Sequence, residues 1–128
     1  MNLFIYLPGF SEKSQPFLNG LRRLPSEISV EVFDTRAAFI RRLRQPKDDS
    51  LVAVLFDPSH EDLESMRNAR QLLVNVPLLL VLDDQDMLTM ALAHRLLPSY
   101  ITYVDSDMSQ LFSVIIKLLP PGLEAQKT

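Results

Sequence analysis

The chain has 128 residues, of which 47% are hydrophobic and 23% charged, and its formal net charge is −3 at pH 7. This length is typical of one domain and is sufficient to bury a sizeable core. The sequence contains no cysteine, which excludes disulfides and thiolate metal sites, and the acidic balance argues against nucleic acid as a partner. No apolar run approaches the roughly 20 residues of a membrane-spanning helix, and no basic leader is seen. We therefore expect a cytoplasmic protein that does not contact a membrane.

Apolar segments alternate with helix-patterned segments along the whole chain. This alternation predicts an α/β fold, with a parallel sheet covered by helices on both faces. Two of the apolar segments contain no polar residue at all, as is typical of parallel strands that are buried on both sides. The five predicted strands are Leu3–Leu7, Ile28–Phe33, Leu51–Phe56, Leu78–Leu82 and Ile101–Val104.

Residues that favour helix starts follow the predicted strands. Asp34 or Thr35 can cap the second helix, Ser59 the third, and Ser106 or Asp107 the last. In an open parallel sheet, ligands and chemistry gather at the carboxyl ends of the strands. The residues directly after the strands are therefore the first candidates for function.

Prolines and composition set the remaining boundaries. Pro25 ends the first helix, because proline lacks the backbone donor and restricts the residue before it. The fourth helix is predicted over Met87–Leu97, and Pro120-Pro121-Gly122 stops the fifth. We expect one domain over residues 1–122, followed by a tail or the start of a linker over residues 123–128.

The order of these segments, with Asp57 directly after the third strand, resembles the CheY-like receiver domain of response regulators over nearly the whole chain. Leu51–Phe56 with Asp57 resembles the strand that presents the phosphoacceptor, Val76–Val81 the proline-led fourth strand, and Tyr100–Asp107 the fifth strand and its helix start. The resemblance implies a three-layer, flavodoxin-like (βα)5 sandwich with a parallel five-stranded sheet of order 2-1-3-4-5. It also implies a role in two-component signalling.

The same resemblance implies the residues that phosphorylation of Asp57 would need. A receiver holds Mg²⁺ with an acidic pair after strand one, and it contacts the phosphoryl oxygens with a hydroxyl residue after strand four and a lysine after strand five. These groups neutralise and position the transferred phosphoryl group. This sequence has Leu7, Pro8 and Gly9 in place of the acidic pair, Leu82 in place of the hydroxyl residue, and Val104 or Asp105 in place of the lysine.

These replacements predict an atypical pseudo-receiver. Two unit charges 4 Å apart interact by about 4 kcal/mol at an effective dielectric constant of about 20, so Asp105 in place of a lysine disfavours a phosphoryl dianion. We expect a non-enzymatic signalling domain that needs no cofactor and acts by protein contact. The alternative is a receiver that still accepts phosphate at Asp57, with Mg²⁺ as its cofactor.

A relocated metal site is a second hypothesis for the same edge. Asp57, Asp83, Asp84 and Asp105 follow strands three, four and five, which are neighbours in this fold. Four carboxylates close together could hold a divalent cation. The more ordinary interpretation is that each aspartate favours the start of a helix through capping and the helix dipole.

Catalytic and nucleotide-binding alternatives have weaker support. His60 and His94 are not spaced as ligands within one helix, and His60 is either a candidate general base or a solvated helix residue. Ser59 and His60 are adjacent to each other near Asp57, whereas triad members are brought together by the fold. The loop after the first strand has one glycine, Gly9, which falls short of a nucleotide or flavin fingerprint.

The segment Met87–Tyr103 carries more apolar residues than one buried stripe needs. The receiver resemblance implies that the fourth helix, fifth strand and fifth helix form the face used for dimers and output partners. We therefore predict a protein partner or a homodimer at this face, while the alternative places the same residues in the core. The candidate interface residues are Met90, Leu96, Leu97, Tyr100 and Tyr103.

Overall fold

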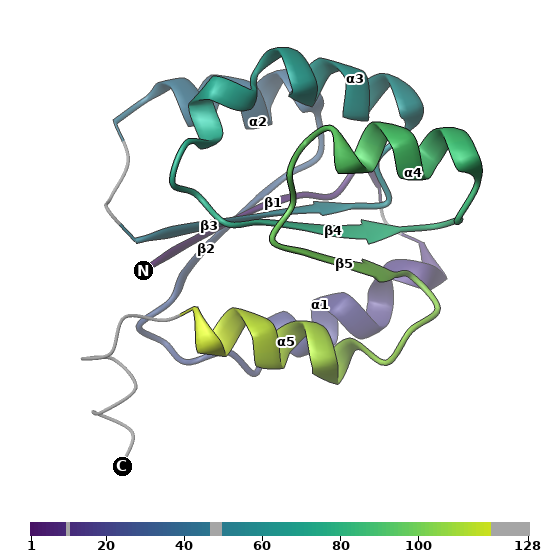
Figure 1. Ribbon diagram of the computed structural model, residues 1–128. Coiled ribbons are helices and arrows are strands. Elements are labelled where there is room, and N and C mark those ends of the chain that lie inside the picture. Colours follow the sequence, from purple (N-terminus) through teal and green to yellow (C-terminus); the bar gives the residue numbers. More distant parts are fainter. Residues whose placement is uncertain (10, 47–49, 119–128) are drawn as a thin grey trace.

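The computed structural model describes residues 1–9, 11–46 and 50–118. Within them, a five-stranded parallel sheet lies between two layers of helices (Figure 1). The strands are β1 Asn2–Tyr6, β2 Ser29–Phe33, β3 Leu51–Phe56, β4 Leu78–Leu82 and β5 Tyr100–Tyr103. The α-helices are α1 Gln15–Leu21, α2 Arg36–Arg44, α3 His60–Asn68, α4 Met87–His94 and α5 Met108–Lys117, and short 3₁₀ helices lie at η1 Glu12–Ser14 and η2 Arg70–Leu73.

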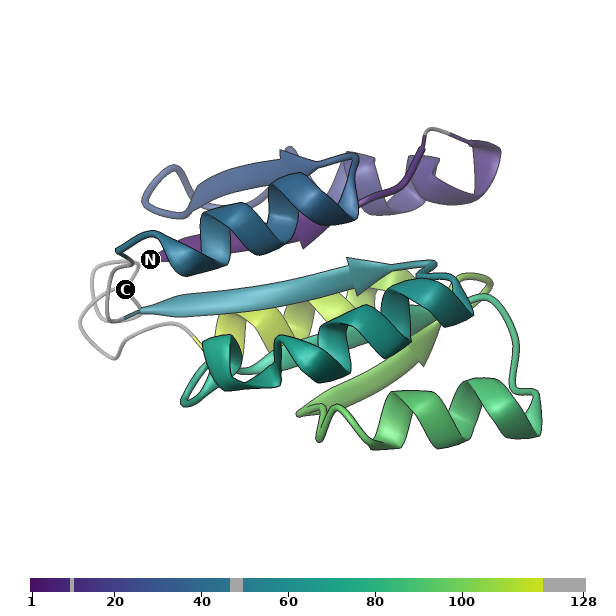
Figure 2. The ribbon, with the colours of Figure 1, turned by 90° about the horizontal axis from the view of Figure 1, so that it is seen from above.

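The strand order is β2-β1-β3-β4-β5, and every pairing is parallel. Helices α1 and α5 cover one face of the sheet, and α2, α3 and α4 cover the other, as Figures 1 and 2 show from two directions. The predicted flavodoxin-like (βα)5 fold and its strand order are therefore confirmed. The predicted end of the domain at residue 122 and the predicted tail over residues 123–128 lie outside the described residues.

The central strands have the predicted bounds, whereas the edges of the other elements differ. β3 and β4 match their predicted ranges because all of their side chains are buried, with at most 5% exposed. β1 and β5 each lie one residue earlier than predicted, and β2 begins one residue later. Helix α4 ends at His94 rather than Leu97, because Leu97 adopts a positive φ of 53°, a backbone conformation that terminates helices.

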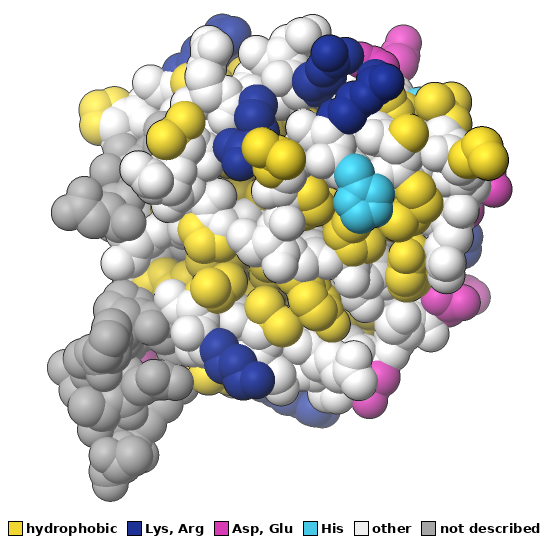
Figure 3. All heavy atoms as spheres, in the orientation of Figure 1, with side chains coloured by type: hydrophobic (Ala, Val, Ile, Leu, Met, Phe, Trp, Pro, Cys, Tyr) yellow, Lys and Arg dark blue, Asp and Glu magenta, His cyan; other side chains and the backbone are white. Residues whose placement is uncertain are grey.

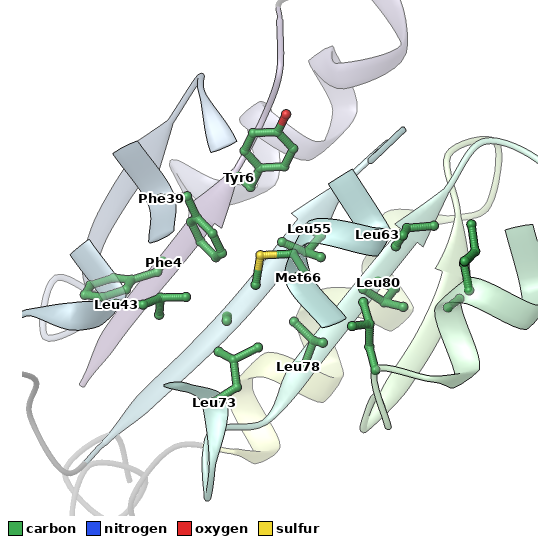
Figure 4. Packing of buried hydrophobic residues seen from close by; sticks show 14 of the residues in the cluster. Phe4, Tyr6, Phe39, Leu43, Leu55, Leu63, Met66, Leu73, Leu78 and Leu80 are labelled. Carbon is green, nitrogen blue, oxygen red and sulfur yellow. The ribbon is translucent and has the colours of Figure 1, made fainter. Parts of the chain in front are cut away.

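Two hydrophobic clusters pack against the two faces of the sheet. Figure 4 shows the larger one, in which Phe4 and Tyr6 of β1 lie against Phe39 of α2, and Leu63 and Met66 of α3 lie over β3 and β4. Burial of apolar surface on both faces is the main force that holds the helices on the sheet. This packing fixes the loops at the carboxyl ends of the strands.

Side-chain caps set where helices α2 and α5 begin. Thr35 Oγ1 accepts a hydrogen bond from Ala38 N at 3.1 Å, which selects Thr35 over its predicted alternative, Asp34. Asp107 Oδ1 accepts one from Ser109 N at 2.9 Å, which selects Asp107 over Ser106. Such a cap typically contributes about 1 kcal/mol.

Across the described ranges, the structure contains no helix with the length and apolar character needed to cross a bilayer.

Candidate functional site

Asp57 lies at the carboxyl edge of the sheet, directly after β3. Its backbone has a φ of 50°, and its N–H donates to the Val81 carbonyl at 2.7 Å. This left-handed conformation is uncommon for residues other than glycine, although aspartate tolerates it better than most. The fold thus places the Asp57 carboxyl group, half-buried, between the loops that follow β1 and β4.

A lysine that the sequence analysis did not select lies at the same edge. Lys13 of η1 donates to both carboxylate oxygens of Asp83, at 3.1 and 3.2 Å. This hydrogen bond raises the pKa of Lys13. Burial, followed by the charge of Asp83, raises the pKa of Asp57, while the charge of Lys13 lowers it. The loop after β1 therefore supplies a positive charge where the sequence had predicted none.

Most of the residues that stand at the positions of the receiver's functional residues are apolar, and two of them are buried. The side chains of Leu7 and Leu82 are 3% and 1% exposed and belong to opposite hydrophobic clusters. Pro8 and Asp105 are exposed, and Val104 is half-buried. A hollow of about 500 Å³ lies between the loops after β1, β4 and β5, and it is lined by Glu12, Lys13, Pro16, Asp83, Val104, Asp105 and Ser106.

The four candidate metal ligands are not gathered into one site. Throughout the described residues, no group of three or more His, Asp or Glu side chains is placed to hold a metal ion. Asp84 stabilises the turn before α4, since its Oδ1 accepts from Asp86 N at 2.9 Å. This hydrogen bond, together with one from the Thr89 side chain, lowers the pKa of Asp84. The side chain of Asp84 therefore has a structural role in the turn before α4.

A buried polar network ties β1, α2 and α3 together at the same edge. The Tyr6 hydroxyl donates to Asp62 Oδ2 at 2.9 Å, and Arg36 Nη1 donates to Asp62 Oδ1 at 3.1 Å. Asp62 and Ser59 also form a capping box, with each backbone N–H donating to the other side chain at 3.0 Å. Burial and the hydrogen bond to Asp62 raise the pKa of Tyr6 well above its usual value. Asp62 is 6% exposed, so this is a buried and fully partnered carboxylate.

The histidines do not form a catalytic group with Asp57. His60 Nε2 lies 2.7 Å from Thr89 Oγ1, a contact that joins α3 to α4. The Ser59 hydroxyl accepts from Asp62 N as part of the helix cap. His94 lies exposed at the end of α4. The geometry therefore gives His60 and Ser59 roles in joining and capping helices.

One of the predicted interface residues is not on the surface. Leu96 is 0% exposed and packs in the cluster between α4 and the sheet, whereas Leu97 is 71% exposed. The difference arises because the helix ends before these residues, and the positive φ of Leu97 turns its side chain outward. Tyr100 and Tyr103 are half-buried, and the Tyr103 hydroxyl lies 3.8 Å from the sulfur of Met90.

Two exposed residues of α4 extend this surface beyond the prediction. Met87 is 91% exposed and Leu88 is 55% exposed, while the polar Thr89 beside them is 4% exposed. Helix α4 therefore presents apolar side chains to solvent as well as to the core, and it buries one polar side chain. Figure 3 shows the face that contains α4, β5 and α5, where hydrophobic side chains gather over these elements. The excess of apolar residues in α4 was the signal for this feature, but the sequence does not reveal which of them face outward.

Comparison with known proteins supports the fold. No protein-family profile matches this sequence, and no curated protein sequence matches it. The structure is similar to the crystal structure of a response regulator CheY-like protein from Mesorhizobium loti, with a TM-score of 0.67 and 17% sequence identity over 92% of this chain and 98% of that chain. At 17% sequence identity, the similarity between the two structures concerns the fold alone. The chain thus has a CheY-like receiver fold.

Proposed function

We propose that this chain is an atypical receiver domain of a two-component-type signalling protein, which acts by protein contact without the usual phosphorylation of Asp57. The observation that carries the proposal is the composition of the carboxyl edge. Leu82 is buried where a receiver has a hydroxyl group, and Val104 or Asp105 stands where it has a lysine. Asp57 therefore has neighbours that do not favour a phosphoryl group.

Charge supports this proposal. Phosphoryl transfer depends on neutralising the oxygens of the transferred group, and Mg²⁺ prefers several oxygen ligands. The loop after β1 offers Leu7 and Pro8 at the positions of the acidic pair. Asp83 and Asp84 add to the negative potential at Asp57. A phosphoryl dianion at Asp57 would meet this like charge, which Lys13 opposes.

The surface of α4 supports action by contact. Clusters of exposed apolar side chains mark interaction sites, and Met87, Leu88 and Leu97 are all more than half exposed. The left-handed backbone of Leu97 costs roughly 1–2 kcal/mol, which a glycine at this position would avoid. A strained leucine at an exposed helix end favours a role in binding a partner protein or a second copy of the chain.

Lys13 supports a second candidate function, a receiver that accepts phosphate at Asp57. Its ammonium group already lowers the pKa of Asp57, so it acts on that carboxyl group in the folded chain. In this alternative, Lys13 would leave Asp83 and contact the phosphoryl oxygens in place of the missing strand-five lysine. Mg²⁺ would then need ligands from Asp57 and from water.

Adduct formation distinguishes the two functions. The wild-type chain and the Asp57→Asn variant would be incubated with Mg²⁺ and either acetyl phosphate or a beryllofluoride salt, and intact mass and ¹⁹F NMR would detect the adducts. We expect no stoichiometric adduct. An adduct that forms on the wild-type chain but not on Asp57→Asn would refute the proposal, and its loss in Lys13→Gln would support the second candidate.

Light scattering tests the contact surface with a homodimer as the simplest partner. Leu97→Glu places a charge directly after α4, beside its exposed apolar residues. Val32→Glu is the matched control, because Val32 is exposed on β2 at the opposite edge of the sheet. We expect concentration-dependent association that Leu97→Glu weakens and Val32→Glu leaves unchanged. A wild-type chain that stays monomeric at all concentrations would exclude the homodimer. Leu96 is unsuitable for this test because it is buried.

A further inference from the structure

A cavity of about 520 Å³ lies between α1 and α5, on the face of the sheet opposite α2, α3 and α4. Figure 1 shows these two helices side by side beneath the sheet. The volume falls within the range of about 300–1,000 Å³ that is usual for small-molecule sites. The lining combines apolar, hydroxyl and charged groups, among them Gly20, Arg23, Leu24, Asp107, Ser109 and Phe112.

The wall of this cavity is held in place by close packing. The Phe112 ring lies directly on the α1 backbone at Gly20, where any added Cβ would overlap the ring. The same ring stacks on Phe17 with centroids 5.7 Å apart, and Phe17 stacks on Phe56 at 5.0 Å. Phe112 is therefore fixed from two sides, and the cavity is already formed without a ligand.

Opposite charges lie at the two ends of the cavity. Helices α1 and α5 both run away from the carboxyl edge of the sheet (Figure 1). Asp107 caps the start of α5 and therefore lies at the edge end, whereas Arg23 follows the end of α1 and lies at the far end. The hydrogen bond from Ser109 N lowers the pKa of Asp107, which keeps its carboxylate charged. No ion pair or side-chain hydrogen bond joins Arg23 to another of the described residues.

A neighbouring hollow strengthens this polarity. The hollow beside Lys13 and Asp83 shares Pro16 and Ser106 with the cavity, and it adds the exposed carboxylates of Glu12 and Asp105 near the Asp107 end. The edge end is therefore negative and the far end positive. A ligand that carries an ammonium group at one end and a carboxylate at the other would match both ends.

We propose that this cavity binds a short peptide or a peptide-like zwitterion. Its ammonium group would lie at Asp107 and its carboxylate at Arg23, with an apolar side chain against Phe112 and Leu24. Pro16 and Arg23 are seven positions apart, which at the helical rise of 1.5 Å per residue gives a length of about 10 Å. Three extended peptide residues span about the same length. This site is separate from Asp57 and from the exposed surface of α4.

The test uses the tripeptide Ala-Phe-Leu and two matched probes. Acetylation of its amino terminus removes the ammonium charge, and amidation of its carboxyl terminus removes the carboxylate charge. ¹H–¹⁵N NMR titration of the full chain would follow the signals of Gly20, Ser109 and Phe112. We expect saturable shifts at these residues with the free tripeptide and roughly tenfold weaker binding of each blocked probe, since each loses one charge-assisted contact.

Two variants test which end of the peptide lies at Asp107 and which lies at Arg23. Asp107→Asn keeps a good helix cap, and Arg23→Gln keeps the length of the side chain. Acetylation should weaken binding to the wild-type chain but not to Asp107→Asn, and amidation should weaken binding to the wild-type chain but not to Arg23→Gln. Thermal unfolding would show that both variants fold. Equal binding of the blocked and free peptides, shifts confined to other residues, or no saturable binding would each overturn the proposal.

Discussion

The two halves of the carboxyl edge are built differently. On the side of β1 and β3, Asp62 is buried and accepts hydrogen bonds from Tyr6, Arg36 and Ser59. On the side of β4, Asp83 pairs with Lys13 in solvent, where the two side chains are 43% and 58% exposed. Buried ions contribute to stability only when fully paired, and exposed pairs contribute little. The comparison indicates that the first half holds the fold together, whereas the second is free to take part in function.

The largest expected effect is that of Asp62→Ala. This change removes the partner of the Tyr6 hydroxyl and the Arg36 guanidinium, as well as one half of the cap on α3. We expect the free energy of unfolding to fall by about 3 kcal/mol, as measured by urea denaturation. The matched change in the other half is Asp83→Ala. If it destabilised the chain equally, the contrast between the halves would be wrong.

Tyr6→Phe should have a smaller effect in the same direction. The ring stays in the core, but one hydrogen bond to a buried carboxylate is lost, so we expect a loss of about 1–2 kcal/mol. Tyr103→Phe is the control from the other half, because its hydroxyl contacts only the Met90 sulfur, at 3.8 Å, in the described structure. A loss for Tyr103→Phe that matched that for Tyr6→Phe would contradict the comparison.

Asp57→Asn sharpens the comparison, because Asp57 lies between the two halves. Burial raises the pKa of Asp57 above its usual value of 3.8, so its charged form is disfavoured in the folded chain. Removing the charge should therefore stabilise the chain at pH 7. This gain should shrink as the pH falls through the pKa of the folded state, and it should vanish below the usual value. Thermal unfolding of both chains from pH 3 to pH 7 measures this gain in stability. A gain that increased toward acid pH would show that the pKa of Asp57 is lowered, not raised, by folding.

Lys13→Gln is expected to have the smallest effect on stability. Because the ion pair with Asp83 is exposed, we expect no measurable change in the midpoint of urea unfolding. The pKa of Asp57 should nevertheless rise, since the charge of Lys13 lowers it. NMR titration of the Asp57 carboxyl carbon tests this. An unchanged titration would show that Lys13 does not act on Asp57.

Parts of this architecture follow directly from local sequence pattern. β3 and β4 were predicted correctly because strands covered on both faces have no polar positions. The end of α4 was predicted incorrectly because an apolar run continues past the helix, so the pattern alone cannot separate Leu96 inside from Leu97 outside. The prediction was correct for β3 and β4, where the backbone stays extended throughout the apolar run. It was wrong for α4, where the backbone leaves the helical conformation within the apolar run.

The site was less predictable because its contacts join distant parts of the chain. Lys13 and Asp83 are 70 residues apart, and Tyr6 and Asp62 are 56 residues apart. No spacing rule connects such pairs before the fold is known. The available signals were a lone lysine in the loop after the first strand and a tyrosine within an apolar strand. Asp57 itself was identified because it directly follows a strand, which is a local feature.

The left-handed backbone of Asp57 limits which substitutions can report on its chemistry. Glutamate is the customary replacement for imitating a permanent negative charge, but it fits a φ of 50° less well than aspartate does. A phenotype of Asp57→Glu would therefore mix backbone strain with charge, whereas asparagine accepts this conformation readily and removes the charge without that strain.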